Sequence, residues 1–415
     1  MKDEQPDFAH RAKRSRQYFE TDAGLSRRAL GLIAMGGAAA VAALGNLRAA
    51  NAMASDSLKN GGGIKLCGQG STNPTDDDLK FMNEVGYNYV YATATRGAML
   101  TTDEQLAAKK RYADAGITLH SIRYLLGGKG GNDINTMLLG LPGADESLES
   151  VRSWIRSTGK DGAGFDYTGS RLMITGVWED GMVDIRGGAM EREFDPTNPN
   201  VHRGDFLGDL APDAKHPERG LNTLYWGREC GYDEVMANFK KYIAEGLGPV
   251  LDENNVFLAF HPDDPPVFES LGGVARIMCN YARYKAMFAA ANSSHIGIQM
   301  CCGTWNEGGP KMGKDLLSVL KEFNTLKKYR EIHFRNISSP PVKGVPNFHE
   351  TFQDNGYYDM YKIMKTLMDI AFQGLVHLDH HPNNMPGSPY SYLAYVAGFM
   401  HACLVRAKAE PKGTL

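Results

Sequence analysis

Short apolar segments alternate with stretches of helical periodicity along most of the chain. Each segment spans four to seven residues rich in β-branched or aromatic side chains, a composition typical of strands. Between the segments, apolar residues recur at steps of three or four, as at Val235, Phe239 and Ile243, which is the period of an amphipathic helix. The predicted strands cover residues 64–67, 87–93, 117–123, 171–177, 256–261, 295–301, 331–335 and 375–379.

Eight strands that alternate with helices predict a parallel sheet, and this number of units favours a closed (β/α)8 TIM barrel. We therefore expect an α/β fold with a single domain over residues 63–410. A doubly wound open sheet is the competing fold, but no Gly-x-Gly-x-x-Gly follows an early strand and the sequence contains no P-loop. Residues 180–225 contain several Pro, Gly and Asp, and predict an irregular insertion that could cover the site.

The first 52 residues have the composition of an export signal. The arginines of Ser26-Arg27-Arg28 precede an uncharged run over 29–45, and Ala50-Asn51-Ala52 resembles a cleavage site. This order is typical of a twin-arginine-type signal over 1–52, here followed by a linker over 53–62. A permanent membrane anchor is the alternative, because the apolar run of 17 residues is at the lower edge of a span. We expect an exported protein, periplasmic or secreted, that meets the membrane only through this signal.

Charge and cysteine content narrow the range of partners. The 415 residues carry a net charge of −3, and without residues 1–52 there remain 37 Lys and Arg against 43 Asp and Glu. A mildly acidic chain gives no reason to expect nucleic acid or an anionic membrane as a partner. The six cysteines show no disulfide framework, and a bond between the neighbours Cys301 and Cys302 would be strained.

Four successive predicted strands end in residues that bind transition metals. They place His261, Cys301, His333 and Asp379 at intervals of 40, 32 and 46 residues, each close to one β/α unit. Function in a TIM barrel sits at the C-terminal ends of the strands, so these side chains could converge on one point. Imidazole, thiolate and carboxylate suit zinc, manganese, iron or cobalt, and the set does not choose between them. Each residue alone has an ordinary structural explanation, but four consecutive strand ends favour a metal site.

The same part of the chain resembles the mannonate dehydratase family from about residue 230 to 405. The His-Pro-Asp-Asp-Pro-Pro run over 261–266 is the most specific feature, and the order and spacing of the shorter motifs agree. Those motifs are Cys301-Cys302-Gly303-Thr304, His333-Phe334-Arg335-Asn336, Phe348-His349-Glu350, Asp359-Met360 and Asp379-His380.

This resemblance implies a (β/α)8 barrel with a divalent metal, usually Mn²⁺, that removes water from D-mannonate to give 2-keto-3-deoxy-D-gluconate. Fe²⁺, Co²⁺ or Zn²⁺ are the alternatives for the metal. By the same resemblance, His380 falls on the catalytic histidine of the family. Tyr392 matches the catalytic tyrosine, with Tyr390 as the fallback. The predicted metal positions are His261, Cys301, His333 and Asp379.

Two arginines are predicted to bind substrate. Arg335 projects to the same side of its strand as His333 and could hold a substrate carboxylate, with an ion pair to a neighbouring acid as the alternative. Arg123 ends the third predicted strand and would line the other half of the pocket.

The first four predicted strands lack the motifs of the family, so the substrate half of the pocket differs. We therefore expect a metal-dependent enzyme whose partner is a small-molecule sugar acid or sugar. The sequence does not decide whether the chain forms a homo-oligomer. The alternatives are an exported sugar isomerase or epimerase of the xylose-isomerase-like group and a non-catalytic carbohydrate-binding barrel.

Overall fold

The computed structural model describes residues 63–94, 99–123, 133–171, 182–196, 229–380, 382 and 389–415. The predicted export signal over 1–52 and linker over 53–62 lie outside these ranges, as does the second part of the predicted insertion. The described residues belong to one compact unit. No helix among them is long and apolar enough to cross a membrane.

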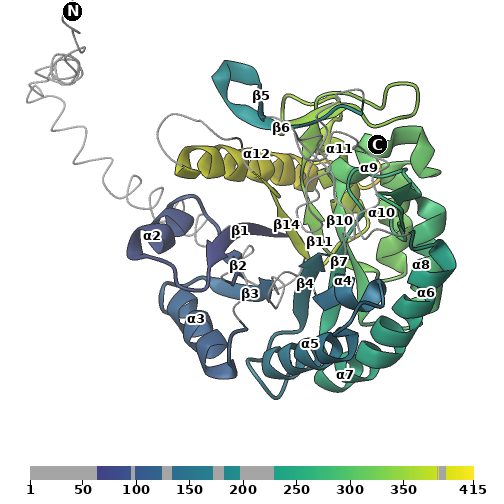
Figure 1. The fold of residues 1–415 in the computed structure, drawn as a ribbon. Coiled ribbons are helices and arrows are strands. Elements are labelled where there is room, and N and C mark those ends of the chain that lie inside the picture. The colour runs from purple at the N-terminus through teal and green to yellow at the C-terminus, as the bar shows by residue number, and fades with distance from the viewer. Residues whose placement is uncertain are drawn as a thin grey trace, which may run out of the picture. The chain divides into compact units, whose positions relative to one another are not determined.

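Eight parallel strands form the central sheet, in the hydrogen-bonded order β3-β2-β1-β14-β11-β10-β7-β4 (Figure 1). The two strands at the ends of this order, β3 and β4, are consecutive in the chain, as the closure of a barrel requires. The TIM-like barrel is therefore confirmed and the open doubly wound sheet is wrong. The strand bounds are β1 Lys65–Ser71, β2 Tyr89–Thr93, β3 Thr118–Arg123, β4 Tyr167–Arg171, β7 Phe257–His261, β10 Ile296–Cys301, β11 Tyr329–His333 and β14 Leu375–His377.

Buried Thr168 joins the two ends of the strand order. Its hydroxyl on β4 donates a hydrogen bond to the Ile122 carbonyl on β3 at 3.0 Å. The Trp154 indole N–H in turn donates to the same hydroxyl at 3.3 Å. Thr168 therefore links β3, β4 and helix α5 (Ala144–Thr158) through one side chain.

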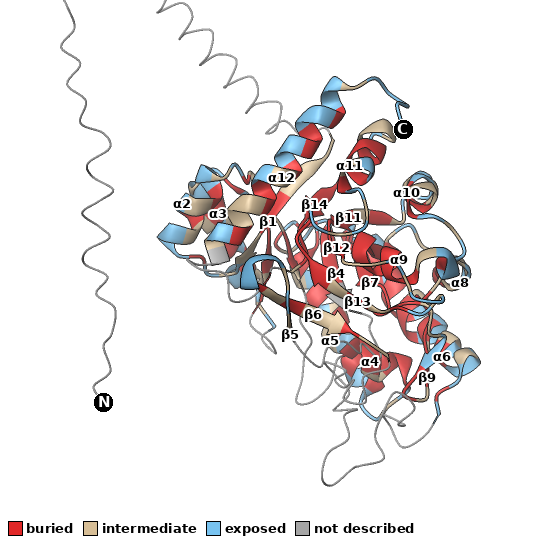
Figure 2. Cartoon of the chain, turned by 90° about the horizontal axis from the view of Figure 1, so that it is seen from above, coloured by how far each residue is buried: buried red, intermediate tan, exposed pale blue. Residues whose placement is uncertain are grey.

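Helices surround the strands, with buried residues on the strands and inner helix faces and exposed residues on the outer faces (Figures 1 and 2). The predicted helical period at Val235, Phe239 and Ile243 is confirmed, because all three side chains are buried. They lie in α6 (Tyr232–Asn238) and the π-helix that continues it (Phe239–Leu247). The other helices are α2 Asp76–Glu84, α3 Thr102–Asp114, α4 Asp133–Leu138, α7 Gly248–Asn254, α8 Tyr281–Ala291, α9 Cys302–Gly308, α10 Leu316–Thr325, α11 Met360–Asp369 and α12 Pro389–Ala409.

A second, four-stranded sheet starts from the C-terminal end of β11. Its order is β12-β13-β6-β5, and the pairing is antiparallel throughout. Strand β12 (Asn336–Ile337) begins three residues after β11 ends, and β13 is Phe348–Thr351. Strands β5 (Met182–Asp184) and β6 (Met190–Phe194) come from the predicted insertion.

The sequence-based bounds need correction at the insertion and at several strands. Strand β1 extends to Ser71, β11 is Tyr329–His333, and β14 ends at His377, two residues before Asp379. The insertion is not irregular over its first part, since β5 and β6 form a hairpin whose turn contains Gly187 and Gly188 at φ 75° and 79°. The glycines that suggested a loop are there because the turn needs a left-handed backbone. The fourth barrel strand covers Tyr167–Arg171 rather than 171–177. Tyr167 is buried there and stacks on Phe257 of the adjacent strand β7, with ring centroids 6.1 Å apart.

We predict that Thr168→Val lowers the free energy of unfolding by about 1–3 kcal/mol, because the two hydrogen bonds of the Thr168 hydroxyl, to the Ile122 carbonyl and from the Trp154 N–H, are lost. Urea unfolding followed by far-UV circular dichroism measures the change. Thr168→Ser is the matched control, since it keeps the hydroxyl and should recover most of the loss. Equal stability of the valine variant and the wild type would contradict the role given to this link.

Candidate metal centre

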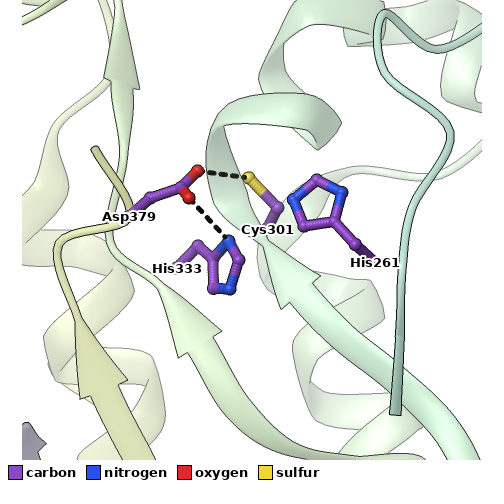
Figure 3. Close-up of side chains that lie close together, drawn as sticks. All are labelled: His261, Cys301, His333 and Asp379. Atoms are coloured by element: carbon purple, nitrogen blue, oxygen red, sulfur yellow. Dashed lines mark hydrogen bonds and ion pairs between the residues drawn. The ribbon is translucent and has the colours of Figure 1, made fainter. Parts of the chain in front are cut away.

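Four side chains meet at the C-terminal end of the sheet, three from the last residues of β7, β10 and β11 and one from just after β14 (Figure 3). One ligand atom from each of His261, Cys301, His333 and Asp379 lies within 4.8 Å of the others, and all four residues are buried. The structure thus brings together the complete set that the sequence predicted. The donors are two imidazole nitrogens, one thiol sulfur and one carboxylate oxygen, a combination that suits a divalent transition metal.

His261, the last residue of β7, is held with one nitrogen free for a metal. Its Nδ1 lies 2.9 Å from the Pro262 carbonyl, to which it donates a hydrogen bond. Burial, reinforced by nearby His333, lowers the pKa of His261 to about 3. The imidazole is therefore neutral, and its Nε2 keeps a lone pair for coordination.

His333 has a buried ring nitrogen, Nδ1, that is available to a metal. Its Nδ1 is a buried nitrogen with no hydrogen-bond partner among the described residues, 3.2 Å from Oδ1 of Asp379. Burial opposes protonation, but the Asp379 carboxylate raises the pKa of His333 well above its ordinary value. A cation is thus favoured at this nitrogen, and a metal would displace the proton. The residues present fit a bound metal.

Cys301 and Asp379 face each other across the cluster. The Cys301 sulfur lies 3.7 Å from Oδ2 of Asp379 and accepts a hydrogen bond from the Thr304 N–H, which caps helix α9. Asp379 has a φ of 97°, a backbone conformation that costs free energy for a residue with a side chain. The side-chain amide of Gln69 donates to its carbonyl, and its own N–H donates to Nδ1 of His377 at 3.2 Å. These contacts keep the strained ligand in place.

Arg335 lies buried beside the cluster, where acidic groups surround its guanidinium. Its Nη1 contacts Oε1 of Glu350 at 2.8 Å, and its Nη2 contacts Oδ2 of Asp264 at 3.0 Å. Burial raises the pKa of the Asp264 carboxyl, but Arg335, a hydrogen bond with Glu307 and nearby His261 together lower it to about 2. Further contacts join Arg335 to Glu307, to Thr304 Oγ1 at 3.0 Å and to Asp379 at 3.5 Å. This geometry favours the ion-pair alternative over a direct contact with the substrate carboxylate.

The network around Arg335 explains the motifs that carried the resemblance. A Cβ at Gly303 would lie 2.1 Å from Nε of Arg335, so only glycine lets the guanidinium pack against this backbone. The Thr304 hydroxyl donates to Asp264 at 3.0 Å, which joins the Cys-Cys-Gly-Thr and Asp-Asp motifs. The other aspartate of the pair, Asp263, accepts from the Met278 N–H at 2.7 Å.

His380 lies next to the cluster with part of its ring accessible. Its Nδ1 is 2.7 Å from Oε2 of Glu350 and its Nε2 is 3.3 Å from Oδ1 of Asp379. The side chain is 23% exposed, more than any of the four predicted ligands. A histidine held by a carboxylate at one nitrogen can move a proton at the other.

The two tyrosines predicted for catalysis lie on α12, and their hydroxyls donate to residues other than His380. Tyr392, on α12, is 1% exposed, and its hydroxyl donates to Oε1 of Gln353 at 2.8 Å. Tyr390 stacks on Phe81 and donates to Asp78, so it anchors α12 to α2. The segment just before α12, residues 383–388, lies outside the described residues. The catalytic role of Tyr392 stays a prediction from the resemblance.

Arg123, predicted to bind substrate, points into the barrel beneath the cluster. Its Nη2 pairs with Glu331 and lies 2.9 Å from Nε2 of His377 and 3.2 Å from Nε2 of His333. Its guanidinium also stacks on Tyr91, 3.8 Å from the ring centroid. Sequence reasoning missed Glu331 and His377. The sequence signal for both is that each lies two positions before a predicted ligand, Glu331 before His333 and His377 before Asp379. Residues two apart in a strand share a face.

Comparison with known proteins identifies the relatives of this chain. Residues 222–405 match the family described as D-mannonate dehydratase (UxuA), close to the region of the predicted resemblance. The mannonate dehydratase of Thermotoga petrophila is 26% identical over 301 residues, which cover 68% of this chain and 78% of that protein. The mannonate dehydratase of Enterococcus faecalis is 30% identical over 162 residues, 39% of this chain and 42% of its own length.

Solved structures extend the likeness to the first half of the barrel. The mannonate dehydratase of Streptococcus suis superposes with a TM-score of 0.65 at 20% identity, covering 86% of this chain and 97% of that one. A xylose isomerase domain protein from Planctomyces limnophilus reaches a TM-score of 0.50 at 12% identity, covering 84% and 99%. At these identities the likeness shows the shared barrel fold.

We predict that Cys301→Ser weakens binding of a divalent metal by more than about 100-fold, because losing a ligand costs more than the 10–100-fold loss of an outer partner. Metal content and competition with a chelator measure the effect. Cys302→Ser is the matched control, because Cys302 is an adjacent buried thiol outside the cluster and should keep the metal. Equal binding by both variants would exclude Cys301 as a ligand.

We predict that Arg335→Met lowers the free energy of unfolding by about 3–5 kcal/mol, because it leaves Asp264 and Glu350 buried without a counter-charge. Arg330→Met is the control from the same strand, since its partner Asp166 is 61% exposed and the pair should contribute less than about 1 kcal/mol. Urea unfolding compares the two. Similar losses in both variants would mean that the buried network does not stabilise the fold.

Proposed function

We propose that this chain, whose residues 222–405 match the mannonate dehydratase family, is a metal-dependent hydro-lyase that eliminates water from a sugar acid. The observation that carries the proposal is the buried donor set of His261, Cys301, His333 and Asp379, with His380 beside it. The accessible histidine lies next to the carboxylate ligand, so a substrate near the metal would also meet a group that can move a proton.

The proposed reaction has two steps that these residues can serve. A proton leaves the carbon next to the substrate carboxylate, and the neighbouring hydroxyl then departs with a proton. A bound divalent metal supplies Lewis-acid stabilisation of the negative charge that develops on the carboxylate side. Glu350 fixes Nδ1 of His380, which leaves Nε2 as the nitrogen that takes or gives the proton.

The substrate and the metal are finer parts of the proposal. D-Mannonate or a similar sugar acid is supported by the names of the relatives, and Mn²⁺ is supported by the resemblance, with Fe²⁺, Co²⁺ or Zn²⁺ as alternatives. Because Arg335 and Arg123 are both paired with buried acids, we assign substrate recognition to groups other than these two. A sugar isomerase is less well supported, since the donor set holds a single carboxylate.

The N-terminal sequence supports export as a further part of the proposal. The twin arginines, the uncharged run and the small residues at 50–52 occur in the order of an export signal. The proposed enzyme would then act outside the cytoplasm, periplasmic or secreted, on a sugar acid available there.

We predict that the Mn²⁺-loaded protein converts at least one member of a panel of aldonic acids into a 2-keto-3-deoxy acid, detected by nuclear magnetic resonance of the products. His380→Asn should lower kcat by about 10²–10⁴-fold, because the proton-transfer group is lost. His295→Asn is the control, as His295 lies at the N-terminal end of β10, and should retain activity.

Two results would contradict this proposal. Aldose–ketose exchange without loss of water would move the assignment to an isomerase. Full activity of His380→Asn would remove the proposed proton-transfer role.

A further inference from the structure

We propose that Glu331 is a positioning residue that orients two predicted metal ligands at once, His333 directly and Asp379 through His377. This inference deepens the proposed function and rests on the metal site described above. Glu331 lies on β11, is 0% exposed, and sits two residues before His333 on the same face of the strand. Since His333 pairs in register with His377 on β14, one carboxylate can reach both imidazoles.

The direct contact settles which nitrogen of His333 is free. Oε1 of Glu331 lies 3.1 Å from Nε2 of His333, and an ionised carboxylate only accepts hydrogen bonds. The ion pair between Oε1 of Glu331 and Nη2 of Arg123 favours the ionised carboxylate. With Nε2 of His333 donating to Glu331, a bound metal would meet Nδ1, the buried nitrogen that lies 3.2 Å from Oδ1 of Asp379.

The indirect contact runs from Glu331 to Asp379 through the two ring nitrogens of His377. Nδ1 of His377 accepts a hydrogen bond from the Asp379 N–H, so its hydrogen is on Nε2, which donates to Oε1 of Glu331. Glu331 thereby fixes the ring that holds the backbone of Asp379. That backbone has a φ of 97° and needs such support to remain in a strained conformation.

Arg123 makes a second metal at Glu331 unnecessary. Glu331, His333 and His377 form another group with the spacing of metal ligands. The Nη2 atom of Arg123, however, already contacts all three residues. A guanidinium thus supplies the positive charge beneath the cluster, and the group acts as a support for the upper site.

The two oxygens of Glu331 have different neighbours, which provides a matched pair of variants. Oε1 contacts both imidazoles and Arg123, whereas Oε2 accepts from the Tyr167 hydroxyl. The side-chain amide of Gln299 lies 3.3–3.4 Å from both oxygens. Glu331→Gln changes the charge and the acceptor facing the imidazoles. Tyr167→Phe removes a hydrogen bond to the same carboxylate and leaves the face toward the ligands intact.

The test measures Co²⁺ binding to the full chain by chelator competition, together with the absorption spectrum of the bound Co²⁺. We expect Glu331→Gln to raise the dissociation constant by about 10–100-fold and to shift the Co²⁺ bands. Tyr167→Phe should lower the urea midpoint and yet keep the dissociation constant within about threefold of the wild type, because its loss is structural. Comparable losses of affinity in both variants, or an unchanged Glu331→Gln, would overturn the inference.

A measurement on the wild type covers the case in which Glu331→Gln does not fold. Nitrogen-15 resonance of the Zn²⁺-loaded protein should show hydrogen on Nε2 of both His333 and His377. Hydrogen on Nδ1 of either ring would overturn the inference, even with metal bound. Absence of stoichiometric metal from the wild type would instead overturn the proposed function and this inference together.

Discussion

A charge that is buried away from water needs an opposite charge close by. The site of this barrel contains two buried arginines that are balanced in this way. Arg335 and Arg123 are both engaged by acids, the first beside the metal ligands and the second beneath them. Because a buried charge that loses its partner is strongly destabilising, Arg335 constrains the positions of several carboxylates and Arg123 constrains Glu331. The predicted ligands border both networks, with Asp379 3.5 Å from Arg335 and His333 3.2 Å from Arg123, so their positions depend on these ion pairs.

The acidic residues around Arg335 have different roles. Glu350 contacts Arg335 with one oxygen and His380 with the other, and so links the charge balance to the proposed proton transfer. Burial and nearby Asp264 raise the pKa of Glu307 well above its ordinary value, which favours the neutral form of this carboxyl. The Arg335 guanidinium therefore has fewer negative charges to balance than the number of carboxyl groups around it.

The sequence predicted the barrel and the ligand set because both follow from periodicity. Eight apolar segments separated by helical stretches define the strands, and the residues at four consecutive strand ends define the cluster. The fourth strand was misplaced because its residues, including buried Tyr167 and Thr168, are less apolar than the stretch that follows. The role of Arg335 depends on Glu307 and Glu350, which approach it only after folding, so residue spacing on one strand could not show it.

The small sheet connects the insertion to the surroundings of His380. Strand β13 carries Glu350, and its neighbour in that sheet, β6, is encoded in the insertion after the fourth barrel strand. Substitutions in the insertion therefore reach the surroundings of His380 through main-chain hydrogen bonds, at a distance in sequence from every metal ligand. A substitution in β6 would therefore change the surroundings of His380 without touching the four predicted ligands or the two arginines.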